Sequence, residues 1–88
     1  MQTFSKSRIA AIFGVNRTTL YSWEGLGCPV SPPLRPGSRA ELDFEAVLEW
    51  RLCHLEALGA SEEGLVLADK VIRERLSKLL ARQGGARP

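Results

Sequence analysis

The residues with the clearest chemical potential lie between positions 16 and 24, where the side chains suit contact with a nucleic acid. If this stretch forms a helix, Leu20 and Trp23 lie three residues apart on one apolar face. The opposite face then presents polar, hydrogen-bonding and cationic groups, with Asn16 at its start followed by Arg17, Thr18, Tyr21 and Ser22. Side chains of these types hydrogen-bond to base edges and phosphates when a helix lies in the major groove of DNA. The pattern therefore predicts a DNA-contact face.

A second helix and a turn are predicted to hold that face in place. Ser5 is a good N-cap for a helix that buries three apolar side chains at helical spacing, Ile9, Ile12 and Phe13. Gly14 can end this helix in the left-handed conformation, Val15 can wedge between the two helices, and Asn16 can cap the second helix. Residues 5–27 thus indicate a helix-turn-helix. An ordinary pair of helices joined by a glycine turn has the same features, so this alternative stays open.

The charge of the chain is unevenly distributed. The 88 residues carry a net charge of +2, yet residues 1–40 hold five basic residues against Glu24 alone, a net +4. Residues 41–88 hold seven basic and nine acidic residues, a net −2. This asymmetry suits a nucleic-acid face backed by a scaffold. Lys6 and Arg8 lie in the first turn of the first helix, which crosses the DNA backbone in helix-turn-helix proteins, so we expect phosphate contacts there, with simple solvation as the alternative.

Residues 31–40 are predicted to form the tip of a β-hairpin wing. This segment cannot be helical because it contains Pro32, Pro33 and Pro36. Extended segments predicted at 28–30 and 41–44 would be the two strands of the hairpin. The tip carries two candidate DNA-binding residues, because arginine is favoured in the minor groove: Arg35 and Arg39. A surface loop is the alternative.

The remaining reactive residue types give no sign of a metal site or catalytic centre. Cys28 and Cys53 belong to no CxxC motif, and His54 has no acidic or cysteine partner at ligand spacing. The sequence also contains no GxxxxGK[ST] phosphate loop and no nucleophile beside a base. We therefore expect no metal, no cofactor and no enzymatic activity. Since no apolar run approaches the roughly 18 residues of a membrane span, and the N-terminus lacks an apolar leader, we expect a soluble cytoplasmic protein.

The C-terminal half is predicted to form two more helices. Asp43 can cap a helix that ends at Gly59, and its apolar residues would close the core over the first two helices, chiefly Val47, Trp50 and Leu55. Ser61, followed by two glutamates that suit the positive end of a helix dipole, can cap a helix that runs to about Arg82.

The last of these helices carries an apolar stripe at three-four spacing, formed by Leu65, Ile72, Leu76 and Leu79. The stripe is wider than a domain of this size needs, so we expect it to form a homodimer contact or to bind a partner. Packing on its own domain is the alternative. The expected organisation is a DNA-binding domain over residues 1–58, an amphipathic helix for dimerisation or partner contact over 59–83, and a flexible tail over 84–88.

Four short motifs lie within residues 4–56. They are an FGV turn at 13–15, a TxxxW pattern that ends at Trp23, a G-x-P at 27–29 and an AVxxW pattern that ends at Trp50. Together they resemble the N-terminal winged helix-turn-helix domain of lambdoid phage terminase small subunits, the DNA-packaging proteins. Similar motifs occur more loosely in MerR-type regulators and phage excisionases. The chain departs from the terminase family in its shorter length and in a wing rich in proline and arginine instead of glycine and lysine.

This resemblance implies a mainly α fold with a small β-hairpin, in which residues 16–24 are the recognition helix and 31–40 the wing. It also implies a homodimer that binds the packaging-initiation site on double-stranded viral DNA in the host cytoplasm and recruits the large ATPase and nuclease subunit of the terminase. The alternative function is that of a MerR-like transcriptional regulator or an excisionase-type DNA-binding protein. A protein-interaction module whose basic half meets an acidic partner is a third possibility.

Overall fold

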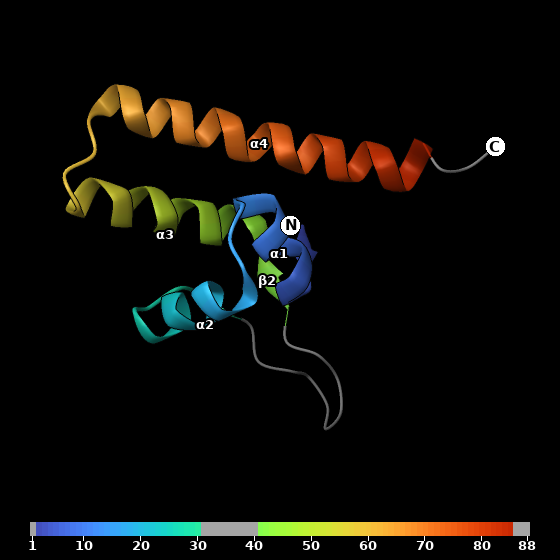
Figure 1. Ribbon diagram of the computed structural model, residues 1–88, viewed down its shortest axis with the longest axis horizontal. Coiled ribbons are helices and arrows are strands. Elements are labelled where there is room, and N and C mark those ends of the chain that lie inside the picture. The colour runs from blue at the N-terminus through green and yellow to red at the C-terminus, as the bar shows by residue number, and fades with distance from the viewer. Residues whose placement is uncertain (1, 31–40, 86–88) are drawn as a thin grey trace.

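Four helices and a two-stranded sheet make up the part of the chain that the computed structural model describes, residues 2–30 and 41–85. In chain order the elements are β1 (Thr3–Phe4), α1 (Lys6–Phe13), α2 (Arg17–Gly25), β2 (Leu42–Asp43), α3 (Phe44–Ala57) and α4 (Glu62–Gly85). Figure 1 shows α4 along one side of the molecule, with α3 and α1 beneath it and α2 on the opposite side. The architecture is mainly α with a small antiparallel sheet, which confirms the predicted fold class at this level.

The predicted local signals set the angle between α1 and α2. Ser5 Oγ accepts a hydrogen bond from the backbone N–H of Arg8 at 3.4 Å, and Asn16 Oδ1 accepts one from the N–H of Thr19 at 2.7 Å. Between the two caps, Gly14 ends α1 with φ at 71°, in the left-handed region that glycine enters without strain. The two helix starts and the glycine turn predicted for residues 5–27 are therefore confirmed.

One apolar core joins all four helices. Its fully buried residues include Ile9 of α1, Leu20 of α2 and Phe44 of α3, and α4 adds residues that are buried almost as completely. The prediction for α3 is confirmed for Val47, which is fully buried. Trp50 is only half-buried and packs against the edge of this core. The core therefore fixes the orientation of α2 through side chains from several helices.

The small sheet joins the N-terminus to the start of α3. In its antiparallel register Thr3 lies opposite Asp43 and Phe4 lies opposite Leu42. The strand predicted at residues 28–30 is wrong, because this segment has no regular secondary structure. Pro29 lacks the N–H that a strand ladder needs, and the N–H next to it, that of Cys28, donates to the carbonyl of Trp23 at 3.0 Å. The predicted wing at 31–40, with its two arginines Arg35 and Arg39, lies outside the described residues.

The helix predicted after Ser61 begins where expected. Ser61 Oγ accepts a hydrogen bond from the N–H of Gly64 at 3.1 Å, and α4 starts at Glu62. Its end was predicted near Arg82, whereas the helix continues to Gly85.

The apolar stripe of α4 packs within the chain. Ile72 and Leu76 are only 6% and 8% exposed and belong to the core, and Leu79 packs against that core. Leu65 is half-buried. Ile72 and Leu76 lie in the core with residues of α1 and α3, so these two side chains pack on their own domain and are not free for the predicted dimer contact, whereas the homodimer itself stays a prediction. The apolar side chains of α4 that stay exposed are others, Val66, Leu67 and Leu80.

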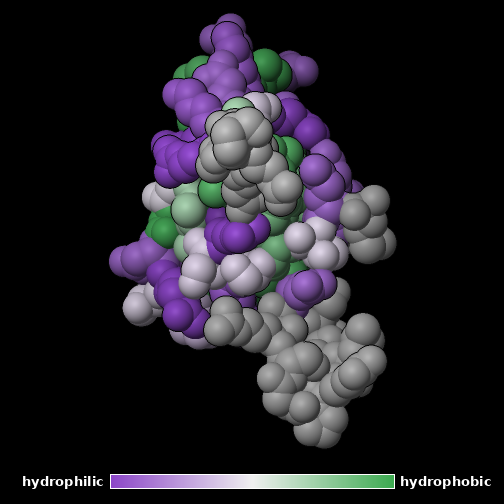
Figure 2. Space-filling view, turned by 90° about the vertical axis from the view of Figure 1, so that its right-hand side faces the viewer, coloured by the Kyte–Doolittle hydropathy of each residue, from purple (hydrophilic) through white to green (hydrophobic). Residues whose placement is uncertain are grey.

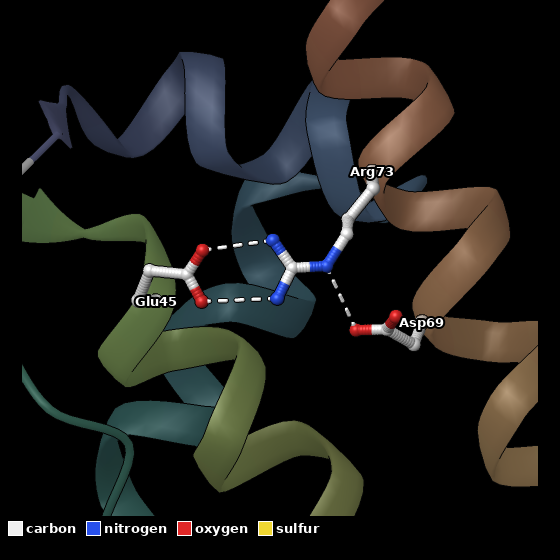
Figure 3. A network of polar contacts seen from close by, with 3 residues as sticks. All are labelled: Glu45, Asp69 and Arg73. Carbon is white, nitrogen blue, oxygen red and sulfur yellow. Dashed lines mark hydrogen bonds and ion pairs between the residues drawn. The ribbon is translucent and has the colours of Figure 1, made fainter.

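A polar link on the surface ties α4 to α3 (Figure 3). Arg73 donates two parallel hydrogen bonds to the Glu45 carboxylate, at 2.8 Å and 3.1 Å, and its Nε donates to Asp69 Oδ1 at 3.1 Å. The hydrogen bonds from Arg73 lower the pKa of Glu45 below its ordinary value of 4.5. Because the Arg73 and Glu45 side chains are 48% and 61% exposed, solvent screens the pair, and we expect it to stabilise the fold by no more than about 1 kcal/mol.

Replacing Glu45 by glutamine should therefore destabilise the protein slightly at neutral pH and not at all in acid. Folding lowers the pKa of this carboxylate, so its full stabilisation is present when the pH is above the pKa of the unfolded chain, near 4.5. The stabilisation is lost as the pH falls through the lower pKa of the folded chain. Urea titrations at neutral and acidic pH should show a small difference from the parent chain that vanishes in acid. Glu49→Gln, at an exposed site on the same helix, is the matched control. A deficit of Glu45→Gln that persists in acid would contradict the assignment.

Candidate nucleic-acid interface

The outer face of α2 presents the side chains that the sequence assigned to DNA contact. Leu20 is fully buried and Trp23 is 6% exposed, so one side of α2 belongs to the core. The opposite side is solvent-exposed and is the predicted DNA-contact face, formed by Arg17, Thr18, Tyr21 and Ser22. The predicted division of this helix into a core side and an outer side is confirmed.

Tyr21 lies at the centre of the DNA-contact face, between two cations. Arg17 Nη2 donates a hydrogen bond to Tyr21 Oη at 3.1 Å, and the Arg17 guanidinium carbon lies 6.0 Å from the ring centre. From α1, Lys6 Nζ lies 4.7 Å from the centre of the same ring, within the range of a cation–π interaction. A phosphate or a base edge beside this ring would meet positive charge from both helices.

Lys6 also links α1 to α2 through an ion pair. Its Nζ lies 3.3 Å from each carboxylate oxygen of Glu24, and the two side chains are 23% and 25% exposed. The carboxylate offsets part of the lysine charge, so we expect Lys6 to attract phosphate less strongly than Arg17 does. The sequence did not reveal this pair, because its partners are 18 residues apart and meet only when the helices pack.

Two further predicted contact residues, Asn16 and Ser22, keep hydrogen-bonding capacity, and a third, Arg8, is exposed. Asn16 uses its side-chain oxygen to cap α2, which leaves the amide NH₂ as a donor. Ser22 Oγ donates to the backbone carbonyl of Thr18 at 3.3 Å and can still accept a hydrogen bond. Arg8 is exposed in the first turn of α1. The described residues therefore place a mixed set of donors and acceptors around the cationic centre of the face.

A row of aromatic rings supports α2 from the core side. Trp23 packs edge-to-face on Phe13 with ring centres 6.1 Å apart, and its ring centre lies 5.7 Å from that of Trp50. Trp50 in turn stacks on the half-buried His54, with ring centres 5.0 Å apart. The Arg51 guanidinium lies 4.6 Å from the Trp23 ring, and burial lowers the pKa of Arg51. The position of Arg51 could not be predicted from the sequence, because its partner lies on another helix and no local spacing indicates the contact.

The two cysteines are both free and differ in exposure. Cys53 is exposed on α3, whereas Cys28 is only 6% exposed. Two causes raise the pKa of the Cys28 thiol from 9.0 to about 11. Burial is the larger cause, and the nearby negative charge of Glu24 is the smaller. Since the thiolate is the reactive form, Cys28 should be inert in the folded protein.

A chromogenic disulfide reagent at neutral pH should accordingly react fast with one thiol per folded chain and slowly with the other. Cys53→Ser should remove the fast phase and Cys28→Ser should leave it intact. In denaturant both thiols should react, because unfolding removes the burial that protects Cys28. A fast phase that survives Cys53→Ser would show that Cys28 is accessible.

Residues 2–30 and 41–85 contain neither a metal-binding cluster nor a membrane-spanning helix. No group of three histidine, cysteine or acidic side chains in these ranges is placed to hold a metal ion. None of the helices in the same ranges combines the length and the apolar character needed to cross a membrane.

No protein-family model matches this chain, and neither does any curated protein. The evidence for a function therefore consists of the predicted DNA-contact face and of the four motifs within residues 4–56 that resemble terminase small subunits.

Proposed function

We propose that this protein binds duplex DNA as a winged helix-turn-helix, with α2 in the major groove. The observation that carries the proposal is that Arg17 and Tyr21 lie on one exposed face of α2, with Lys6 of α1 close to the Tyr21 ring and aromatic rings packed on the core side of the helix. Arginine is the residue that most often contacts guanine in the major groove, and hydroxyl groups can bond to several bases. The first turn of α1 would lie against the phosphates, which fix the register of the protein on the duplex.

We extend this proposal to the recognition of a packaging-initiation site by the small subunit of a phage terminase. This step is supported by the motifs within residues 4–56. Such a protein would work in the host cytoplasm and recruit the large ATPase and nuclease subunit. A MerR-like regulator or an excisionase would bind promoter or attachment-site DNA without affinity for an ATPase. Sedimentation of the chain with a purified large terminase subunit, with and without DNA, separates the two functions.

Arg17→Ala and Tyr21→Ala should each weaken specific DNA binding by about 1–3 kcal/mol. Each change removes a group from the DNA-contact face and leaves the core intact, since both side chains are exposed. The measurement is fluorescence anisotropy with a duplex that the intact chain has selected from a random pool. Affinity should also fall steeply with salt in the parent chain, because bound phosphates release counterions.

Lys70→Ala is the matched control, because it removes one positive charge from an exposed site on α4. Its affinity for the selected duplex should stay close to that of the parent chain. Unchanged affinity in both α2 variants, or an equal loss in Lys70→Ala, would rule out α2 as the element that contacts bases.

A further inference from the structure

A second cationic surface lies in a groove between α1 and the C-terminal half of α4, and the proposed DNA contact does not use it. The groove has a volume of about 260 Å³. Its lining combines an apolar part, Ala11, Ile12 and Leu79, with three cations from successive turns of α4, Arg75, Lys78 and Arg82. This α1–α4 groove of about 260 Å³ has room for a few side chains of a larger ligand.

The three cations of the α1–α4 groove form no ion pair with the described residues. Within residues 2–30 and 41–85, no carboxylate forms an ion pair with any of them, and no acidic residue lines the groove. Arg73 on the same helix is different, because it is paired with both Glu45 and Asp69. Positions 75, 78, 79 and 82 lie on one side of a helix, so α4 presents these three cations and Leu79 together.

Arg75 lies against the end of α1. Its guanidinium lies so close to Gly14 that a methyl group at that position would overlap it. The C-terminal end of a helix carries partial negative charge and attracts a cation, so this position is favourable for the guanidinium. Figure 2 shows this end of the molecule, where hydrophilic side chains cover the upper part, over α4, and apolar patches are visible between them.

The α1–α4 groove and the DNA-contact face lie on opposite flanks of α1. Lys6 extends from α1 to Glu24 on α2, whereas Ala11 and Ile12 border α4. Figure 1 likewise places α2 and α4 on opposite sides of the molecule. A duplex on α2 would therefore leave the groove open to a second ligand.

We propose that the α1–α4 groove binds an acidic, amphipathic segment of a partner protein. Carboxylates of the segment would pair with Lys78 and with the two arginines, whose planar groups bind carboxylates through paired hydrogen bonds. Apolar side chains of the segment would cover Ala11 and Leu79. A nucleic-acid backbone supplies negative charge for the three cations but no apolar side chain to cover Ala11 and Leu79, so it fits the groove less well. Helical segments bind apolar grooves in this manner, and the proposal does not depend on DNA binding by α2.

The test is a selection of displayed random peptides on the intact chain, with depletion on the Lys78→Glu/Arg82→Glu variant. The enriched peptides should combine aspartate or glutamate with large apolar residues at three-four spacing. An enriched peptide, synthesised with a fluorescent label, should bind at least about tenfold more weakly to Lys78→Glu and to Arg82→Glu. Its affinity should also fall as the salt concentration rises. Lys70→Glu, a charge reversal at another exposed position of α4, should bind the peptide as the parent chain does.

Three outcomes would overturn the proposal. In the first, the enriched peptides lack acidic residues. In the second, they bind the two groove variants as tightly as the parent chain, while the circular dichroism spectra show that all variants are folded. In the third, affinity for the selected DNA duplex could fall in Lys78→Glu and Arg82→Glu as far as in Arg17→Ala, which would assign the groove to nucleic acid. A chain that binds the peptide but no DNA would instead count against the proposed function alone.

Discussion

Ile72→Glu should unfold the domain or release α4 from it, at a cost of more than about 4 kcal/mol in the free energy of unfolding. Ile72 is 6% exposed and lies in the core shared by the helices, so the new carboxylate would be buried among apolar side chains. Small domains are stabilised by only about 5–15 kcal/mol in total, so a change of this size removes much of the fold. Urea titration followed by circular dichroism measures the loss.

Val66→Glu is the matched control, because it places the same charge on the same helix at a side chain that is 65% exposed. Its free energy of unfolding should change by no more than about 0.5 kcal/mol. Light scattering on both variants distinguishes the two roles considered for α4. If Ile72 contributed to a dimer contact, Ile72→Glu would yield a stably folded monomer, and that result would contradict its role in the intrachain core.

Trp23→Ala should cost about 3–5 kcal/mol of stability, as expected for the truncation of a large buried aromatic residue. The ring is 6% exposed, packs edge-to-face on Phe13 and contacts Trp50. It also lies beneath the guanidinium of Arg51 at 4.6 Å, and that cation would lose its aromatic partner. Thermal melting should therefore show a large fall in midpoint, and DNA binding should be lost together with the fold.

Tyr21→Ala is the natural comparison, because it removes an aromatic side chain two residues earlier on the same helix. Tyr21 is 49% exposed, so its loss should change the free energy of unfolding by no more than about 0.5 kcal/mol. DNA affinity should nevertheless fall while the melting temperature stays close to that of the parent chain. Equal destabilisation by the two changes would contradict the assignment of Trp23 to the core and of Tyr21 to the outer face.

These contrasts also indicate how much of the structure could be predicted from the sequence. The helix starts at Ser5, Asn16 and Ser61 were predictable because an N-cap bonds to backbone groups within a few residues of itself. The turn at Gly14 was predictable because the left-handed conformation is a property of a single residue. The exposed and buried sides of α2 followed from helical spacing, since Leu20 and Trp23 must share one face.

Other features depended on which elements pack together, and no spacing specifies that. Spacing showed that α4 has an apolar stripe, but only the packed structure places α1 and α3 over Ile72 and Leu76. The extended segment predicted at 41–44 contains the strand at 42–43, yet the partner of this strand is the N-terminal strand, because strand pairing is set by the approach of distant segments.

The chemistry of the surfaces divides in the same way. The sequence by itself determined that Arg17 and Tyr21 share an exposed helical face, because both lie within one short helix. Tertiary structure alone decided that Lys6 pairs with Glu24 and that Arg75 lies against Gly14. The physical reason is that a charge acts over a few ångströms of space, and residues far apart in the chain reach that range only after the apolar faces of their helices have packed.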